Sequence, residues 1–194
     1  MNRRLGVLIS GRGSNLKAII DAIGDGRLDA VIAVVISNRP DAPGLEHARR
    51  AGLETLVLSH KAFPTREDYD RALVEELRAR DVAVVCLAGF MRLLSPVMVG
   101  AFPNRILNIH PSLLPNYPGL HPQQQALDAG ATVSGATVHF VNTDLDAGPI
   151  VLQRQIPVLP GDTVETLATR ILAVELQLYP EAIARVLDSQ MKGN

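Results

Sequence analysis

An asparagine and a histidine two positions apart are the residues of this chain whose types and spacing best suit chemistry. Asn108 and His110 belong to an apolar run that starts at Ile106, is typical of a buried β-strand and breaks into a proline-rich loop. Because side chains alternate along a strand, both polar groups face the same side. An amide and a protonated imidazole together can stabilise negative charge on a carbonyl oxygen under attack. We therefore predict a catalytic pair, whereas a lone histidine in a strand is more often structural.

A carboxylate further along the chain can complete this pair. Asp146 lies in the turn-rich loop 144–149, and a carboxylate beside an imidazole favours its protonated form. Taken alone, Asp144 and Asp146 are also ordinary turn formers. No G-x-S-x-G motif supplies a nucleophile, and the single cysteine, Cys86, lies in an apolar run typical of a buried position. We therefore predict direct transfer between two bound substrates, without a covalent enzyme intermediate.

The loop 10–15, with the sequence Ser-Gly-Arg-Gly-Ser-Asn, joins a predicted strand to a predicted helix. Its glycines permit a tight turn, and the free amides at a helix start attract an anion. The loop lacks the third glycine of a dinucleotide fingerprint, because Leu16 occupies that position, and it has no Gly-Lys-Ser/Thr of a P-loop. We therefore predict a site for one phosphate, with Gly13, Ser14 and Asn15 as donors. The alternative is a plain glycine turn with a polar cap.

Short apolar runs alternate with helical patterns in the first half of the chain. Buried strands are expected over residues 5–9, 31–36, 55–58 and 82–87. Helices are expected over residues 15–23, from the turn at residues 38–41 to about residue 50, and over residues 65–80. In the last of these helices, Thr65 is the expected N-cap. Strands separated by helices pair in parallel with right-handed crossovers, so we predict a doubly wound α/β sheet.

The second half of the chain departs from this alternation. A strand is expected over residues 106–109, but no helical pattern separates the strand-like runs 137–141 and 150–156. These two runs are expected to add an antiparallel or mixed extension to the sheet. A helix over residues 163–187 closes the chain, and Pro180 is expected to break or kink it. The predicted fold is a mainly parallel mixed sheet with helices on both faces, in one domain.

Composition limits the classes of function. The chain has 194 residues, of which 47% are hydrophobic and 20% charged, as in an ordinary globular domain. Its net charge of -1 gives no general attraction to nucleic acid or to an anionic membrane. No apolar run is long enough to span a bilayer, so a cytoplasmic protein is expected. His110, His121 and His139 lack the paired spacing of a zinc site, and we predict no metal.

The motifs taken together resemble the folate-dependent formyltransferase family. The resemblance rests on the run from Asn108 to Pro115, on Asp146 and on the loop 10–15, and it extends through residues 87–92, 117–121 and 138–141. It is closest to the members that formylate glycinamide ribonucleotide. It implies transfer of a formyl group from 10-formyltetrahydrofolate to the amine of that substrate. The products would be formylglycinamide ribonucleotide and tetrahydrofolate, in de novo purine biosynthesis.

The resemblance also implies a role for each candidate residue. His110 would be the proton donor, Asn108 would hold the formyl oxygen, and Asp146 would keep His110 charged. The ribonucleotide would be bound through its phosphate and along the last helix, by Gly13, Ser14, Asn15 and Glu175. The site for the folate cosubstrate would be lined by Arg66, Met91, Arg92, Leu93, Leu94, Asn108, Asn142, Thr143, Asp144, Leu145 and Asp146.

These roles divide the single domain 1–194 into two halves. Residues 1–100 would bind the phosphate, and residues 101–194 would carry catalysis and the folate. Small-molecule substrates are expected, with no nucleic acid or membrane partner, in a monomer or a homodimer. The loop 111–133 carries several prolines and suits a mobile lid; the alternatives are a merely flexible surface loop or a loop that contains a short helix.

Two other functions remain open at the level of sequence. A hydrolase that passes the formyl group from 10-formyltetrahydrofolate to water uses a similar Asn, His and Asp set. A phosphosugar-binding module would use the glycine loop but has no need of Asn108, His110 and Asp146 together.

Overall fold

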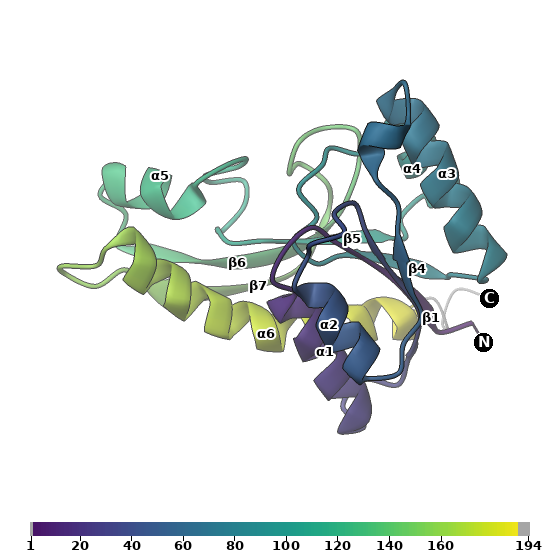
Figure 1. The fold of residues 1–194 in the computed structure, drawn as a ribbon. Helices are drawn as coiled ribbons and strands as arrows, with labels where there is room; N and C mark the ends of the chain where they lie inside the picture. The colour runs from purple at the N-terminus through teal and green to yellow at the C-terminus, as the bar shows by residue number, and fades with distance from the viewer. Residues whose placement is uncertain (1, 190–194) are drawn as a thin grey trace.

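The computed structural model describes residues 2–189, which form a seven-stranded sheet flanked by helices (Figure 1). In chain order the strands are β1 (Arg4–Ile9), β2 (Val31–Ser37), β3 (Thr55–Val57), β4 (Val84–Leu87), β5 (Ile106–His110), β6 (Val133–Phe140) and β7 (Ile150–Pro157). Across the sheet their order is β3-β2-β1-β4-β5-β6-β7. The strands from β3 to β5 pair in parallel, whereas β6 and β7 add antiparallel pairs. The predicted mixed, mainly parallel sheet is confirmed; residue 1 and residues 190–194 of the predicted domain lie outside the described residues.

Helices cover both faces of this sheet, as a doubly wound fold requires. They are α1 (Ser14–Gly24), α2 (Gly44–Arg50), α3 (Arg66–Ala79), α4 (Pro96–Ala101), α5 (Pro122–Asp128) and α6 (Val164–Ser189), with a 3₁₀ turn, η1 (His60–Ala62). Figure 1 shows α1, α2 and α6 below the sheet and α3 and α4 above it. Alternate residues of β1 serve the two layers, since Val7 packs in the core with α1 and α6 and Leu8 in the core with α3.

Local sequence signals account for several element boundaries. The Thr65 hydroxyl accepts a hydrogen bond from the Asp68 backbone N–H at 3.1 Å, which confirms the predicted cap of α3. Cys86 is buried in the centre of β4, as predicted, and burial raises the pKa of its thiol to about 12. A thiol held protonated in this way is a packing residue and not a nucleophile.

Of the two outcomes predicted at Pro180, a break or a kink, the break is wrong. Helix α6 runs through it without interruption from Val164 to Ser189. Proline removes one backbone hydrogen bond, but Tyr179, Ala182 and Ile183 around it are fully buried against the sheet. Tertiary packing of that face therefore outweighs the local propensity to break.

The predicted lid is only partly irregular. The short helix α5 occupies Pro122–Asp128, within the loop 111–133, and begins with a proline, which is favoured at a first helical position. Loop 111–133 therefore contains the short helix of the alternative interpretation. Helix α4, which also begins with a proline, Pro96, was not predicted. Both helices are too short to show a clear helical periodicity.

The ends of β1, β4 and β5 define one edge of the parallel part of the sheet. The loops that follow these strands start at Ser10, Ala88 and Pro111, and adjacent strand ends bring them together. Tyr179 of α6 holds two of the strands there, since its buried hydroxyl lies 3.0 Å from the carbonyl oxygens of Leu87 and Leu107. Among residues 2–189 the structure has no helix with the length and apolar character needed to cross a bilayer.

Candidate active site

Three polar side chains share one face of the neighbouring strands β5 and β6. Asn108 pairs with His139 in the antiparallel register, and Asn108 Nδ2 lies 3.3 Å from His139 Nε2. His110, two residues beyond Asn108, lies on the same face and is buried. The predicted alternation along this strand therefore brings the amide and the imidazole to a common surface.

Asp146 reaches this surface from the loop between β6 and β7. Its Oδ2 lies 3.5 Å from His110 Nδ1, and its Oδ1 lies 3.7 Å from His139 Nε2. The backbone N–H of Gly119 donates to the same Oδ2 at 2.8 Å, so the carboxylate also holds the predicted lid segment. The loop can fold back this tightly because Gly148 has no side chain, and a Cβ there would lie 1.7 Å from the Phe140 carbonyl oxygen.

Both ring nitrogens of His110 face oxygen acceptors. His110 Nε2 lies 2.9 Å from the carbonyl oxygen of Tyr117, and Nδ1 faces the Asp146 carboxylate. Neither oxygen can donate a proton, so the arrangement provides an acceptor for each N–H of a doubly protonated ring. The site therefore offers an oxygen acceptor to each ring nitrogen of His110.

A buried serine in the loop after β5 and a buried threonine of β6 fix the position of the Tyr117 carbonyl. The Ser112 hydroxyl donates to the Asn116 carbonyl at 2.6 Å and lies 3.2 Å from that of Tyr117. Thr137 of β6 in turn donates to the Ser112 carbonyl at 2.7 Å. The segment that carries one partner of His110 is thus hydrogen-bonded to the sheet at its base.

His139 has different hydrogen-bond partners from those of His110. Its Nδ1 lies 2.9 Å from the Phe140 carbonyl oxygen, which can only accept, so Nδ1 carries the proton and Nε2 accepts from Asn108. Burial lowers the pKa of His139, which favours the neutral ring. This contact uses one N–H of the Asn108 amide, and the second N–H has no acceptor among residues 2–189.

The predicted phosphate loop depends on a glycine at position 13. Gly13 has a φ of 75°, and a Cβ built there would lie 2.5 Å from the Cα of Gly44. Helix α1 starts at the next residue, Ser14, and no side chain in the described part of the chain caps its N-terminus. The capped-turn alternative is therefore not what the structure has, and the amides of the first turn are suited to an anion.

Glu175, 160 positions from Asn15, is brought to the same loop by α6. Asn15 Nδ2 donates to Glu175 Oε2 at 2.8 Å, and both side chains are buried. Burial raises the pKa of the Glu175 carboxyl, against the effect of the Asn15 hydrogen bond. Asn15 Oδ1 is also buried and has no hydrogen-bond partner among residues 2–189. An orphaned acceptor beside a buried carboxyl suits a ligand that brings hydrogen-bond donors.

Apart from Asn108 on β5, the predicted folate-lining residues fall into two loops and one helix start. In the loop after β4, Met91 is 73% exposed and Leu93 60% exposed, while Leu94 packs on the α3 core. The loop of residues 142–146 exposes Leu145, and the Asp144 N–H bonds the Asn142 side chain at 3.0 Å. Exposed apolar side chains on the loops after β4 and β6 suit a flat ligand with apolar faces.

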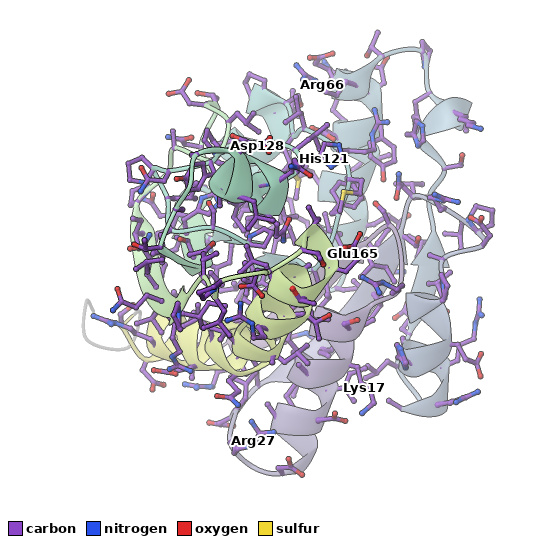
Figure 2. The ribbon with its side chains drawn as sticks, turned by 90° about the vertical axis from the view of Figure 1, so that its left-hand side faces the viewer. Lys17, Arg27, Arg66, His121, Asp128 and Glu165 are labelled. Atoms are coloured by element: carbon purple, nitrogen blue, oxygen red, sulfur yellow. The ribbon has the colours of Figure 1, made fainter. Side chains whose placement is uncertain are left out.

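Arg66 and Arg92 both lie close enough to Asp70 for their charges to act on its carboxyl. The Arg92 guanidinium lies 5.5 Å from the ring centroid of Tyr69, and its Nε is buried with no partner in the described part of the chain. Burial raises the pKa of Asp70, whereas Arg66 and Arg92 both act to lower it, so the three charges lie near one another. Figure 2 shows Arg66 and His121 in the upper part of the molecule, with Lys17 and Arg27 at the lower end.

Comparison with known proteins identifies the family. The family model described as formyl transferase matches residues 3–183. The chain belongs to the formyl transferase family. It is 48% identical to the phosphoribosylglycinamide formyltransferase of Escherichia coli over 96% of this chain and 88% of that protein. It is also 50% identical to the trifunctional purine biosynthetic protein adenosine-3 of Drosophila pseudoobscura pseudoobscura over 98% of this chain, but spans only 14% of that longer protein.

Solved structures give the same family. The glycinamide ribonucleotide transformylase 1 of Symbiobacterium toebii superposes with a TM-score of 0.93 at 58% identity, over 94% of this chain and 86% of that one. The phosphoribosylglycinamide formyltransferase of Coxiella burnetii superposes with a TM-score of 0.90 at 46% identity, over 95% of this chain and 86% of that one. The seven-stranded sheet described above is therefore the fold of this formyl transferase family.

His139 is one residue of this polar surface whose place beside Asn108 the sequence did not predict. His139 was considered only as a metal ligand, and no group of three His, Cys, Asp or Glu side chains in residues 2–189 could hold a metal ion. The alternation of side chains along a strand, which placed Asn108 and His110 on one face, also applies to His139. His139 is a polar residue on a predicted strand, and antiparallel pairing places it opposite Asn108.

A His139→Gln variant is expected to reduce the pH dependence of stability in this formyl transferase. Because burial lowers the pKa of His139 in the folded chain, the unfolded chain takes up more protons as the pH falls through the ordinary histidine range. The wild type should therefore lose more stability than the variant between pH 7.5 and pH 5.5. Urea unfolding at each pH measures this. Glu175 is present in both proteins, so its opposite contribution cancels; parallel curves would contradict the assignment.

Proposed function

We propose that this formyl transferase moves a formyl group from 10-formyltetrahydrofolate to the amine of glycinamide ribonucleotide, in de novo purine biosynthesis. The observation that carries the proposal is the environment of His110, which has an acceptor for each ring N–H and lies beside Asn108. The names of the Escherichia coli relative and of the solved structures support the same reaction.

In the proposed mechanism, Asn108 and His110 act on the oxygen of the formyl group. The amine nitrogen attacks the formyl carbon, and the negative charge that develops on the oxygen is stabilised by the free N–H of Asn108 and by the imidazolium. Such preorganised donors contribute about 10²- to 10³-fold in rate. The geometry supports this role, because the Asn108 amide is held by the neutral His139 and cannot rotate freely.

The proton then moves from His110 to the leaving nitrogen. As the bond between the formyl carbon and N10 of the folate breaks, the Nε2–H of the imidazolium exchanges its hydrogen bond with the Tyr117 carbonyl for one with N10 and transfers its proton there, and the attacking amine loses its own proton to water. Asp146 holds the charged ring before this step. Proton donation of this kind contributes about 10²- to 10⁴-fold, and alignment of the two substrates supplies much of the remainder.

The acceptor would bind at the start of α1 and along α6. The first-turn amides from Gly13 to Asn15 would hold its phosphate, and Glu175 would accept hydrogen bonds from its sugar or amine. The uncapped helix start and the orphaned Asn15 oxygen support this binding mode. A buried carboxyl whose pKa is raised by burial recovers its charge when a ligand brings donors to it.

The residues around the second substrate fit a reduced folate. Exposed Met91, Leu93 and Leu145 would contact its ring system, and Arg66 and Arg92 would attract its carboxylates. The folate supplies an activated formyl group; the protein supplies its orientation. Leu94, Asn142, Thr143 and Asp144 are proposed as further lining residues on the same two loops.

Dependence on the acceptor distinguishes this proposal from the hydrolase. With both substrates present, formylglycinamide ribonucleotide should accumulate in step with tetrahydrofolate. Without the ribonucleotide, formate release should fall to about one hundredth of that rate or less, because water lacks the binding contacts that align the amine. Absorbance of the folate together with product chromatography measures both rates. Formate released at an equal rate without the ribonucleotide would identify a hydrolase.

A further inference from the structure

Ser10 lies between the two proposed substrate sites and has no part in the mechanism described above. It follows β1 directly and precedes the phosphate loop, and its side chain is buried, with the residue 4% exposed. A buried hydroxyl usually satisfies a local backbone group. Ser10 instead joins two segments that are far apart in the sequence.

The Ser10 hydroxyl bonds in both directions. It accepts from the backbone N–H of Met91 at 2.8 Å and donates to the Asn38 side-chain oxygen at 2.7 Å. Its own backbone N–H donates to the Gly89 carbonyl at 3.1 Å. Because the single hydroxyl proton goes to Asn38, a lone pair is directed to Met91. The phosphate loop and the proposed folate loop are therefore joined at Ser10 by two hydrogen bonds, one to Met91 and one to Gly89.

Asn38 connects Ser10 with His60 of η1. Asn38 Nδ2 lies 3.5 Å from His60 Nδ1, and partial burial and the charge of Arg92 lower the pKa of His60, so its ring is a suitable acceptor. His60 packs edge-on against Tyr69 with ring centroids 6.3 Å apart, and Tyr69 carries the Arg92 guanidinium. This series of contacts therefore ends at Arg92, the residue next to Met91.

We propose that Ser10 is a positioning residue that couples the two substrate sites, so that occupancy of the phosphate loop tightens binding of the folate. The inference rests on the proposed function. An anion at Gly13 to Asn15 orders the loop that starts at Ser10, and the hydroxyl fixes the Met91 backbone. Coupling of this kind is reciprocal, because each ligand changes the affinity for the other by the same factor.

Titration of tetrahydrofolate with and without glycinamide ribonucleotide tests this coupling. Tetrahydrofolate carries no formyl group, so both ligands bind without reaction. In the wild type, saturating ribonucleotide should lower the Kd of tetrahydrofolate about fivefold or more. In Ser10→Ala the ratio of the two Kd values should fall below about twofold, because the Met91 N–H loses its acceptor, while the ribonucleotide still binds.

Ser37→Ala is the matched control. Ser37 is a fully buried serine at the end of the adjacent strand, paired with Ile9, but among the described residues its hydroxyl bonds only the Arg39 backbone. It should keep the wild-type ratio of Kd values even if its stability falls, which separates positioning from a general structural effect. If Ser10→Ala fails to fold, Ser10→Cys, with a weaker acceptor of similar size, should show a reduced ratio.

The outcomes separate this inference from the proposed function. Formyl transfer by a wild type with no coupling, or by a Ser10→Ala variant with wild-type coupling, would overturn the inference alone. Loss of coupling in Ser37→Ala as well as in Ser10→Ala would also overturn it. Failure of the wild type to bind the ribonucleotide or to transfer the formyl group would overturn both.

Discussion

A His110→Gln variant is expected to lose about 10³-fold in kcat while it binds glycinamide ribonucleotide with a Kd within about twofold of the wild type. Glutamine can donate a hydrogen bond but cannot hold a proton for transfer, so both the charge beside the formyl oxygen and the acid for N10 are lost. The ribonucleotide contacts are made elsewhere, at Gly13 to Asn15 and at Glu175. Steady-state kinetics and calorimetric titration of the ribonucleotide measure the two quantities.

His121→Asn provides the control for the His110 prediction. His121 is an exposed histidine at the start of α5, with a φ of 57°, a conformation that asparagine tolerates well. Figure 2 shows it at the start of that short helix. Its replacement should leave kcat within about threefold of the wild type. More than a tenth of wild-type turnover in His110→Gln would contradict the proton-donor role.

Period-two alternation was sufficient to predict the shared face of Asn108 and His110. The same rule, applied to the next strand, could have identified His139, but only with the knowledge that β6 pairs with β5 in the observed register. Register depends on the turns and on packing, which no local pattern specifies. The contact of His139 with Asn108 was therefore outside the reach of the sequence alone.

The position of Asp146 shows a second limit. The sequence indicates a turn-rich loop there, and only the resemblance to a family connects it with His110. In the structure the loop folds over the face of the sheet because Gly148 lies against the Phe140 carbonyl, and this brings the carboxylate within 3.5 Å of the imidazole. Long-range contacts such as this one, and the Ser10 to Met91 bond, depend on the assembled sheet.

Two helices show the difference between boundaries set by local sequence and boundaries set by tertiary packing. Thr65 caps α3 as its sequence signal indicates, because the cap is satisfied within the first turn. Pro180 fails to end α6, because the energy that maintains this helix comes from its buried face and not from its own backbone. Local rules were reliable where the partner lies within a few residues, and unreliable where packing decides.

A Gly13→Ala variant is expected to lose about 100-fold or more in kcat/KM for the ribonucleotide and about 2 kcal/mol or more in stability. An L-residue at a left-handed φ costs about 1–2 kcal/mol, and the added Cβ would lie 2.5 Å from the Gly44 Cα, so backbone must move. Such movement would misdirect the amides proposed to hold the phosphate.

Gly11→Ala tests whether the position, and not the loss of any glycine, is responsible for the Gly13 effect. A Cβ at Gly11 meets no heavy atom within 4 Å among the described residues, and its φ lies outside the left-handed region. This variant should remain within about 0.5 kcal/mol and threefold of the wild type. Urea unfolding and kinetics at varied ribonucleotide concentration measure both variants. Equal losses in the two would show that the loop tolerates no side chain at all, and would remove the support that Gly13 gives to a phosphate site shaped by its contact with Gly44.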